Sequence, residues 1–296
     1  MTAKVILNPY SNRWNAKKRW PEARAALQEA GVSFEFAEMS KPGEGTDLAK
    51  EAVLQGYSPI IVAGGDGAIN EVVNGMYLAK PEGVLGPLGI LPLGTANDLP
   101  VNLGLPLDLP GAAQAIAEGK TRRIDLIKAN QWVFDNNSAV GLEPVVTIYN
   151  AKMVWFKGVM RYLAAALRAI WAQPSWQGKL KWDNGEYEGP LTLVSVGNCP
   201  ITGGIFRMSP GADPQDGNIT FVYAYVTGRL RLLRLLPKAI QGTHINDPAV
   251  HQINASRLEI SLKPASPIQL DGEIRDEAIQ HVVYQALPAR LDILTR

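Results

Sequence analysis

Short runs rich in apolar or β-branched residues alternate with amphipathic stretches along the first hundred residues. In those stretches apolar residues recur every three or four positions, which is helical spacing. The runs between them are too short for a helix, and an unbroken apolar run is typical of a parallel strand covered on both faces. This alternation predicts a doubly wound α/β domain. Strands are expected at residues 4–7, 33–37, 59–63 and 88–93, with helices at 14–30, 46–55 and from residue 68 onward.

The pattern changes at about Arg122, where helical spacing gives way to short β-type runs. The turn Asp183-Asn184-Gly185 between two such runs predicts a hairpin. We therefore expect a mostly antiparallel, β-sandwich-like domain over residues 122–287, after the α/β domain over residues 1–121, on which the tail 288–296 packs back. Further β runs lie at 124–128, 132–134, 191–196 and 219–226.

A glycine-rich elbow connects the strand at 59–63 to the following helix. Gly64, Gly65 and Gly67 leave room for phosphate groups near the main chain, and the first N–H groups of the helix favour anions. Glycines in such a turn also serve packing, and Asp66 could simply cap the helix. The elbow is neither a P-loop, because no Gly-Lys-Ser/Thr follows, nor a Gly-x-Gly-x-x-Gly fingerprint.

A second loop of small and polar residues, 94–98, follows the strand at 88–93. Successive parallel strands joined by right-handed crossovers place their exit loops at one edge of the sheet, where ligands of open α/β sheets bind. The two loops should therefore face one another. The Asp66 carboxylate would repel phosphates unless it binds a metal ion or a metal-bound water. We therefore interpret Asp66 as a residue that contacts the metal.

Composition limits the class of protein. The 296 residues carry a net charge of +1 and are 46% hydrophobic, which suits two well-packed domains and offers no global charge for nucleic acid. A single cysteine, Cys199, excludes an internal disulfide and fits a reducing compartment. The first apolar run is too short for a signal peptide, and no apolar stretch is long enough to span a bilayer. We expect a cytoplasmic enzyme.

Five motifs along the chain resemble those of a known family. Residues 64–71 (GGDGAINE) and 91–98 (LPLGTAND) resemble the nucleotide motifs of the diacylglycerol kinase catalytic-domain family, above all its soluble bacterial lipid kinases. The first motif alone is shared with NAD kinases and phosphofructokinases. Gly203-Gly204 and the stretches 209–218 and 270–273 are similar to the lipid-kinase pattern in order and approximate spacing.

The resemblance implies transfer of the γ-phosphate of ATP to a lipid hydroxyl, with Mg²⁺. Glu273 matches the general base of the lipid kinases, and Asp66 is the second catalytic residue we expect. Without the resemblance, Asp271-Gly272 would be an ordinary hairpin turn and Glu273 a solvated strand residue. The expected nucleotide-binding residues are Asn8, Ser40, Gly64, Gly65, Asp66, Gly67, Ala68, Ile69, Asn70, Glu71 and Thr95.

A loop around Asp213, Asp216 and Asn218 resembles one that binds a structural magnesium in relatives. The pattern Asp-x-x-Asp-Gly is also a common turn. Two departures from the family bear on nucleotide affinity: Ala68 stands where the family has threonine, and Asn12 stands in a turn where it has glycine. Asparagine tolerates left-handed backbone angles, so the turn can persist.

Two segments are candidates for transient contact with a membrane surface. Residues 229–238 place Arg231, Arg234 and Lys238 on one helical face beside leucines, and residues 152–157 set aromatic side chains between lysines. Core packing with a solvated basic face explains the first segment equally well. The expected location is cytoplasmic, peripheral to the inner face of the membrane. Alternative functions are an NAD kinase and a catalytically weak nucleotide- or lipid-binding protein; the acceptor lipid and the oligomeric state cannot be read from the sequence.

Overall fold

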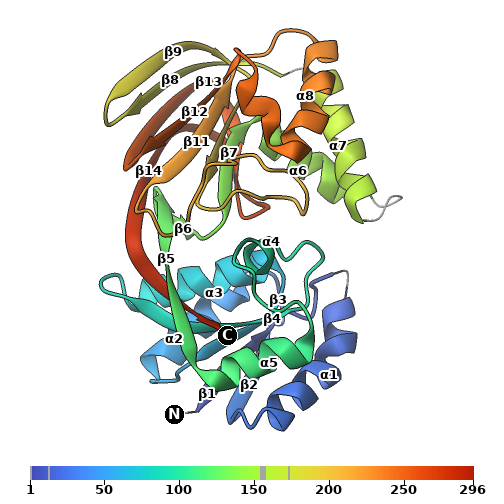
Figure 1. Ribbon diagram of the computed structural model, residues 1–296, viewed down its shortest axis with the longest axis vertical. Coiled ribbons are helices and arrows are strands. Elements are labelled where there is room, and N and C mark those ends of the chain that lie inside the picture. Colours follow the sequence, from blue (N-terminus) through green and yellow to red (C-terminus); the bar gives the residue numbers. More distant parts are fainter. Residues whose placement is uncertain (1, 13, 154–157, 173) are drawn as a thin grey trace. The chain divides into compact units, whose positions relative to one another are not determined.

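The structure, a computed structural model, describes residues 2–12, 14–153, 158–172 and 174–296. The chain divides into two compact units (Figure 1). Unit 1 comprises Met1–Leu126 and Pro288–Arg296, and unit 2 comprises Ile127–Leu287. Among the residues described, no helix has the length and apolar character needed to cross a bilayer.

Unit 1 contains a parallel sheet in the strand order β2-β1-β3-β4. Every residue of β3 is buried, as its unbroken apolar sequence requires. The last residues of the chain extend this sheet, because Leu291 and Ile293 of β14 pair in parallel with β4. The strands are β1 (Ala3–Leu7), β2 (Phe34–Glu38), β3 (Ile60–Gly64), β4 (Leu85–Pro92) and the end of β14 (Glu273–Thr295).

The helices of unit 1 complete the doubly wound arrangement. α1 and α5 share one hydrophobic core with β1, β3 and β4, while α2 packs against α3. The α2–α3 contact is close because a Cβ added to Gly75 would lie 2.2 Å from the Thr46 carbonyl oxygen. The helices are α1 (Asn15–Glu29), α2 (Glu44–Leu54), α3 (Asp66–Ala79), α4 (Asp98–Asn102) and α5 (Leu109–Glu118).

Unit 2 is built on antiparallel strands in the order β12-β11-β10-β7-β13-β14, with β8 and β9 added through β13. The long strand β13 pairs with β8 along its first half and with β7 along its second, so it belongs to both halves of a sandwich-like layer. The strands are the end of β5 (Lys120–Ala129), β6 (Trp132–Phe134), β7 (Asn137–Gly141), β8 (Trp176–Trp182), β9 (Gly185–Leu191), β10 (Leu193–Gly197), β11 (Ile219–Ala224), β12 (Val250–Ala255), β13 (Arg257–Leu270) and the first part of β14; the remaining residues of β5 and β14 belong to unit 1.

Three helices pack on one side of the unit 2 strands: α6 (Leu142–Lys152), α7 (Gly158–Ala172) and α8 (Arg229–Gln241). They share a second hydrophobic core with β11 and with Val250 of β12. A 3-10 helix, η1 (Thr243–Asn246), follows α8.

Most predicted elements occur within a few residues of their expected bounds, and the α/β plus β-sandwich-like fold class is confirmed. The hairpin at 183–185 forms, with Gly185 already paired to Trp182 across the turn. The strand predicted at 191–196 corresponds to β10, which begins two residues later because β9 extends to Leu191. Thr192 separates the two strands, and its hydroxyl accepts a hydrogen bond from the Val226 N–H at 2.9 Å.

Candidate active site

The loop after β1 contacts both of the predicted phosphate loops. The Ser11 hydroxyl accepts a hydrogen bond from the Gly65 N–H at 3.2 Å, and the Thr95 hydroxyl donates to Asn12 Oδ1 at 3.2 Å. Asn12 adopts a left-handed backbone angle (φ 51°), so the predicted turn persists without glycine. Three loops thus meet at the carboxyl ends of β1, β3 and β4, the edge where open α/β sheets bind ligands.

Two glycines allow the β3–α3 and β4–α4 loops to approach each other main chain to main chain. A Cβ added to Gly65 would lie 2.9 Å from the Gly94 Cα, and one added to Gly94 would lie 2.5 Å from the Gly65 Cα. The Leu93 N–H also donates to the Gly64 carbonyl oxygen at 2.9 Å. The two loops face each other as the sequence predicts, and part of their glycine content serves this contact.

The Asp66 carboxylate lies at the start of a neighbouring helix. Its Oδ1 accepts a hydrogen bond from the Leu99 N–H, in the first turn of α4, at 3.2 Å. A carboxylate is favoured there because the first N–H groups of a helix have no intrahelical partners. Asp66 therefore ties α4 to the glycine-rich loop, a structural contact that the sequence did not indicate.

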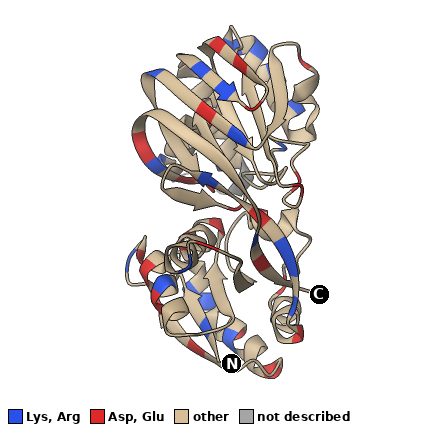
Figure 2. Cartoon of the chain, turned by 90° about the vertical axis from the view of Figure 1, so that its left-hand side faces the viewer, with Lys and Arg blue, Asp and Glu red and all other residues tan. Residues whose placement is uncertain are grey.

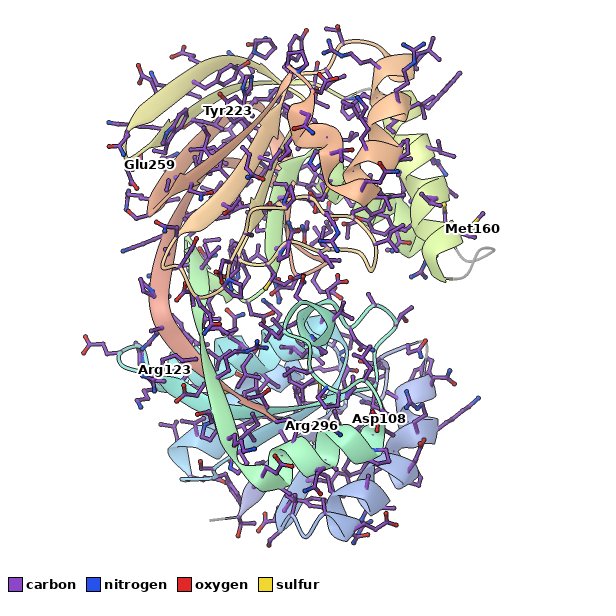
Figure 3. All side chains as sticks on the ribbon, viewed as in Figure 1. Asp108, Arg123, Met160, Tyr223, Glu259 and Arg296 are labelled. Carbon is purple, nitrogen blue, oxygen red and sulfur yellow. The ribbon has the colours of Figure 1, made fainter. Side chains whose placement is uncertain are left out.

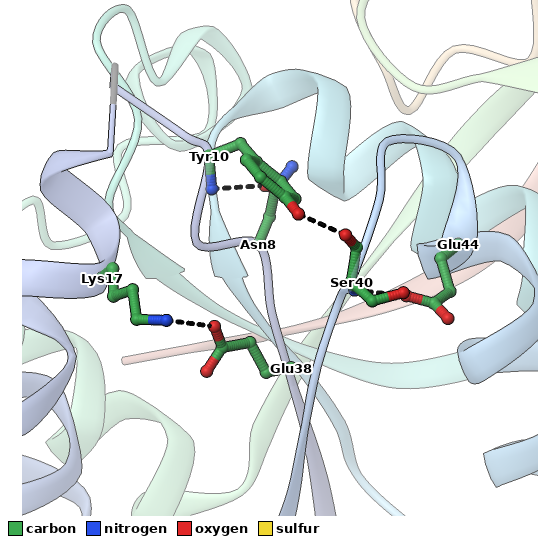
Figure 4. A network of polar contacts seen from close by, with 6 residues as sticks. All are labelled: Asn8, Tyr10, Lys17, Glu38, Ser40 and Glu44. Atoms are coloured by element: carbon green, nitrogen blue, oxygen red, sulfur yellow. Dashed lines mark hydrogen bonds and ion pairs between the residues drawn. The ribbon is translucent and has the colours of Figure 1, made fainter.

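Ser40 is joined to the loop after β1 through Tyr10 (Figure 4). The Tyr10 N–H donates to Asn8 Oδ1 at 3.0 Å, and the Tyr10 hydroxyl donates to the Ser40 carbonyl oxygen. The Ser40 N–H donates in turn to the Glu44 carboxylate, and this hydrogen bond lowers the pKa of Glu44. Asn8 and Ser40, predicted from two different strands, thus belong to one polar network.

Glu71 holds the loop that carries Ser40. Its Oε1 accepts a hydrogen bond from the Gly43 N–H at 3.0 Å, and its Oε2 accepts one from the Gly45 N–H at 2.9 Å. Both carboxylate oxygens are therefore engaged at the beginning of α2. The sequence places Glu71 at the nucleotide, whereas in the structure its carboxylate acts on the position of the Ser40 loop.

Three further residues of the glycine-rich motif have buried side chains. Ala68, Ile69 and Asn70 are 2%, 1% and 0% exposed. Asn70 Oδ1 accepts a hydrogen bond from the Asn74 side-chain amide at 3.2 Å. These side chains face the interior of unit 1, so the predicted nucleotide contact can come from their main chain but not from the side chains as placed.

The close contact of the glycine loops gives a testable prediction. Gly65→Ala should raise the KM for ATP several-fold, because its Cβ would displace the Gly94 backbone and separate the two loops. Gly119→Ala, at the left-handed C-cap of α5 where a Cβ meets nothing within 4 Å, should cost about 1 kcal/mol of stability without changing that KM. Steady-state kinetics against ATP compare the two, and an unchanged KM in Gly65→Ala would contradict the assignment.

In unit 2, the predicted base lies beside a tight hairpin turn. Asp271 and Gly272 have φ angles of 48° and 83°, the pair of positive angles that a type I′ turn requires. Leu270 pairs with Glu273 across the turn. Glu273 is exposed at the first position of β14, where its carboxylate is accessible to a substrate.

Asp271 is more than a turn residue. Its buried carboxylate accepts hydrogen bonds from three successive backbone N–H groups: Asp135 at 3.3 Å, Asn136 at 3.1 Å and Asn137 at 2.9 Å. The Asp271 N–H donates back to the Asn137 carbonyl oxygen at 2.7 Å. The carboxylate therefore fixes the hairpin next to Glu273 against the segment between β6 and β7.

The acidic loop predicted to bind magnesium consists of two side-chain-to-backbone turns. Asp213 Oδ1 accepts a hydrogen bond from the Gln215 N–H at 3.0 Å, and Asp216 Oδ1 accepts one from the Asn218 N–H at 2.8 Å. Within the described residues, no three His, Cys, Asp or Glu side chains are grouped to hold a metal ion. The carboxylate, amide and carbonyl oxygens of this loop are of the type that Mg²⁺ prefers, so the site stays a prediction.

Comparison with known protein families identifies both halves of the chain. A family model described as the diacylglycerol kinase catalytic domain matches residues 2–129, and one described as the YegS C-terminal NAD kinase beta sandwich-like domain matches residues 137–295. The chain belongs to the diacylglycerol kinase catalytic-domain family. This membership confirms the predicted family and the prediction of an ATP-dependent lipid kinase.

Individual relatives of this family cover most of the chain. A diacylglycerol kinase of Staphylococcus carnosus is 29% identical over 274 residues, which are 92% of this chain and 88% of that protein. A diacylglycerol kinase of Bacillus subtilis is 29% identical over 273 residues, 92% and 89% of the two chains. A crystal structure of a diacylglycerol kinase from Bacillus anthracis has a TM-score of 0.74 at 20% identity and covers 100% of this chain and 97% of its own. A further structure from that organism has a TM-score of 0.80 at 22% identity and covers 100% and 95%; both show a shared fold.

Sequence reasoning missed two members of the hydrogen-bond network at the proposed nucleotide site: Tyr10 and Ser11. Both lie in the loop that directly follows the first predicted strand, and this position was the available signal. Their partners, Ser40 and Gly65, come from other loops. Only the parallel sheet brings these loops together, so the pairs are not visible from local sequence.

Proposed function

We propose that this chain transfers the γ-phosphate of ATP to the free hydroxyl of a diacylglycerol or a similar neutral lipid. The observation that carries the proposal is the 29% identity, over 92% of the chain, to proteins named diacylglycerol kinase. Phosphoryl transfer requires a cradle for the donor phosphates, neutralisation of their charge and a group that orients the attacking hydroxyl. Residues of both units can supply these functions.

The connected loops of unit 1 are the proposed ATP site. Main-chain N–H groups of the glycine-rich loop and the first turn of α3 would face the phosphates. Ser40 and Thr95 add hydroxyl groups, and Asn8 supports the Ser40 loop through Tyr10. Mg²⁺ bound with the phosphates on the Asp66 side would neutralise their charge. The hydrogen bonds between the loops keep these groups in place before ATP binds.

Glu273 is the proposed general base in unit 2. Its carboxylate would accept the proton of the lipid hydroxyl while that oxygen bonds to the γ-phosphorus and ADP leaves with the electron pair of the broken bond. The neighbouring Asp271 would act as a positioning residue, because its hydrogen bonds hold the turn that presents Glu273. The loop of Asp213, Asp216 and Asn218 is the proposed structural Mg²⁺ site. We propose residues 1–121 with 288–296 as the nucleotide domain and 122–287 as the lipid domain.

The proposed contact with a membrane surface lies on α7 and α8. Met160, Leu167 and Trp171 recur on one face of α7, and Leu230 lies in the first turn of α8; Trp171 and Leu230 are 68% and 72% exposed. The Arg229 guanidinium lies 4.8 Å from the Trp171 ring centroid, and Figure 3 shows Met160 on the outer side of α7. Exposed apolar and aromatic side chains beside arginine are typical of helices that lie at a lipid surface. We name these five residues the α7–α8 surface.

The basic face predicted on α8 is weaker than its sequence indicates. Arg231 forms an ion pair with Asp247 at 2.6 Å, while Arg234 and Lys238 remain exposed. Figure 2 faces the β8–β9 side of unit 2 rather than α8, and there Lys and Arg are interspersed with Asp and Glu. Most of the second predicted segment, at 154–157, lies outside the described residues. The apolar side chains of the α7–α8 surface therefore carry the membrane proposal, with the protein acting from the inner face of the membrane.

The α7–α8 surface can be tested by vesicle sedimentation. The double variant Trp171→Ala, Leu230→Asp should bind vesicles of anionic phospholipid and diacylglycerol at least roughly tenfold more weakly, because two large apolar side chains no longer leave water. Leu54→Asp is the matched control, since Leu54 is 68% exposed on α2 of unit 1, and should bind as the unchanged protein does. Equal binding by all three proteins would refute the surface.

The proposed activity is tested by supplying γ-labelled ATP and Mg²⁺ with either diacylglycerol in mixed micelles or NAD. Label in the lipid extract supports the proposal, and label in NADP would instead support the NAD kinase alternative. Label in neither product, with ATP binding intact by calorimetry, would support the alternative of a catalytically weak binding protein.

A further inference from the structure

An apolar cavity of about 100 Å³ lies within unit 2, between the three helices and the strands β10 and β11. Its walls include Val146 of α6, Ala166 of α7 and Leu235 of α8, together with Phe206. For comparison, an apolar cavity of roughly 150 Å³ holds one benzene molecule. The cavity therefore has room for a short stretch of a hydrocarbon chain and not for a whole diacylglycerol.

Glu143 is a carboxyl group in this apolar wall. The residue is 6% exposed, and its Oε1 accepts a hydrogen bond from the Gln269 side-chain amide at 3.2 Å. Its Oε2 is buried and has no hydrogen-bond partner among the residues that the structure describes. Burial raises the pKa of Glu143 to about 7, outweighing the opposing effects of the Ser195 hydroxyl and the Gln269 amide. A buried carboxyl with an unpartnered oxygen is costly unless something else bonds to it.

Gln269 connects this carboxyl to the hairpin of the proposed base. While its amide nitrogen donates to Glu143, its Oε1 accepts a hydrogen bond from the Gly272 N–H at 2.8 Å. Gly272 is the residue directly before Glu273. Gln269 is itself 2% exposed, so solvent does not compete for these bonds. A group bound at Glu143 therefore lies two hydrogen bonds away from the main chain that presents Glu273.

We propose that the cavity receives the acyl end of the acceptor lipid and that Glu143, as a neutral carboxylic acid, donates a hydrogen bond to the lipid's ester carbonyl. This inference rests on the proposed function and names the substrate class within it, an acylglycerol recognised through its ester. A neutral carboxyl has one O–H to donate, and an ester carbonyl offers an acceptor but no donor. The first methylene groups of the acyl chain would then lie against the apolar wall. An ether lipid fills the same space but lacks the carbonyl.

Three other titratable groups lie near Glu143. His244 of η1 also lines the cavity, and burial lowers its pKa, which favours the neutral ring. Tyr162 of α7 also lines the cavity. Burial raises the pKa of Tyr284 on β14, whose hydroxyl hydrogen-bonds with Ser138. Glu143 is the carboxyl group of this set, and its pKa of about 7 lies within the range that the test below covers.

The test compares dioctanoylglycerol with its dioctyl ether analogue. The unchanged enzyme should phosphorylate the ester with a roughly tenfold higher kcat/KM at pH about 6, the effect of one hydrogen bond. The preference should shrink as the pH rises to about 8, because ionised Glu143 can no longer donate. Glu143→Leu should lose the preference at every pH. Glu143→Gln keeps an N–H donor, so it should retain the preference and lose its pH dependence.

Direct binding separates this inference from the proposed activity. Calorimetric titration of the two lipids, in micelles and without ATP, should show the same ester preference for the unchanged protein and its loss in Glu143→Leu. Binding with this preference but no phosphorylation would leave the inference standing and remove the proposed activity. Phosphorylation of ester and ether with equal kcat/KM by the unchanged enzyme would overturn the inference and leave the activity intact.

Discussion

Glu273→Gln should lower the kcat for lipid phosphorylation by roughly 100-fold or more while leaving the KM for ATP almost unchanged. Glutamine keeps the shape and hydrogen-bonding reach of the side chain but cannot accept the proton of the lipid hydroxyl. Because Glu273 is exposed at the start of β14, the exchange should not disturb the core. The loss should therefore appear in the chemical step, and single-turnover kinetics at saturating ATP would measure it.

The same strand offers a matched control. Glu277→Gln makes the identical exchange four residues after Glu273, also at an exposed position of β14. This variant should retain full activity. Near-normal turnover in Glu273→Gln would mean that the base lies elsewhere. Asp66 and Asp98 would then be the next candidates, because their loops lie at the carboxyl edge of the unit 1 sheet.

The fold of unit 1 could be predicted because burial follows its hydrophobic period. The unbroken apolar run at 59–63 corresponds to β3 (Ile60–Gly64), which is buried along its whole length. Gly31 and Gly56 directly follow the helices expected at 14–30 and 46–55, and they have φ angles of +77° and +83°, which other residues rarely adopt. Local sequence therefore carries most of the information about the strands, the helices and the edge where the loops gather.

Helix α7 of unit 2 was not predicted, because several of its large apolar residues lie on the outside. Leu167 and Trp171 are exposed, whereas Ile170 and the small residues Ala165 and Ala169 face the core. The usual rule is that large apolar side chains lie on the buried face of a helix. For α7 this rule predicts the wrong face. The same inversion distinguishes the α7–α8 surface from an ordinary solvated helix face.

The motifs located the candidate site but did not define the role of every residue in it. Glu71 and Asp271 both belong to quoted motifs, yet their carboxylates accept backbone hydrogen bonds from Gly43 and Gly45 and from residues 135–137. These donors lie far away in sequence, so no local pattern indicates them. Gln269 and Glu143 belong to no motif at all, and only the packing of unit 2 reveals their connection.

Asp271→Asn should be the most destabilising single exchange at the candidate site, lowering the free energy of unfolding by about 3 kcal/mol. Asparagine has one acceptor oxygen in place of two. Its side-chain NH₂ group would face at least one of the three backbone N–H groups, so that a donor would lie against a donor. These bonds are buried, so water cannot replace them. For a domain of this size the melting temperature should fall by about 10 °C.

Asp183→Asn serves as the comparison for this last prediction, because Asp183 also lies in a hairpin turn and accepts one backbone hydrogen bond, from Ser256. Its position is exposed, so the exchange should cost less than about 1 kcal/mol. Urea unfolding followed by circular dichroism compares the two variants with the unchanged protein. If Asp271→Asn were as mild as Asp183→Asn, the buried carboxylate would not be what holds the turn, and the positioning role of Asp271 toward Glu273 would have to be abandoned.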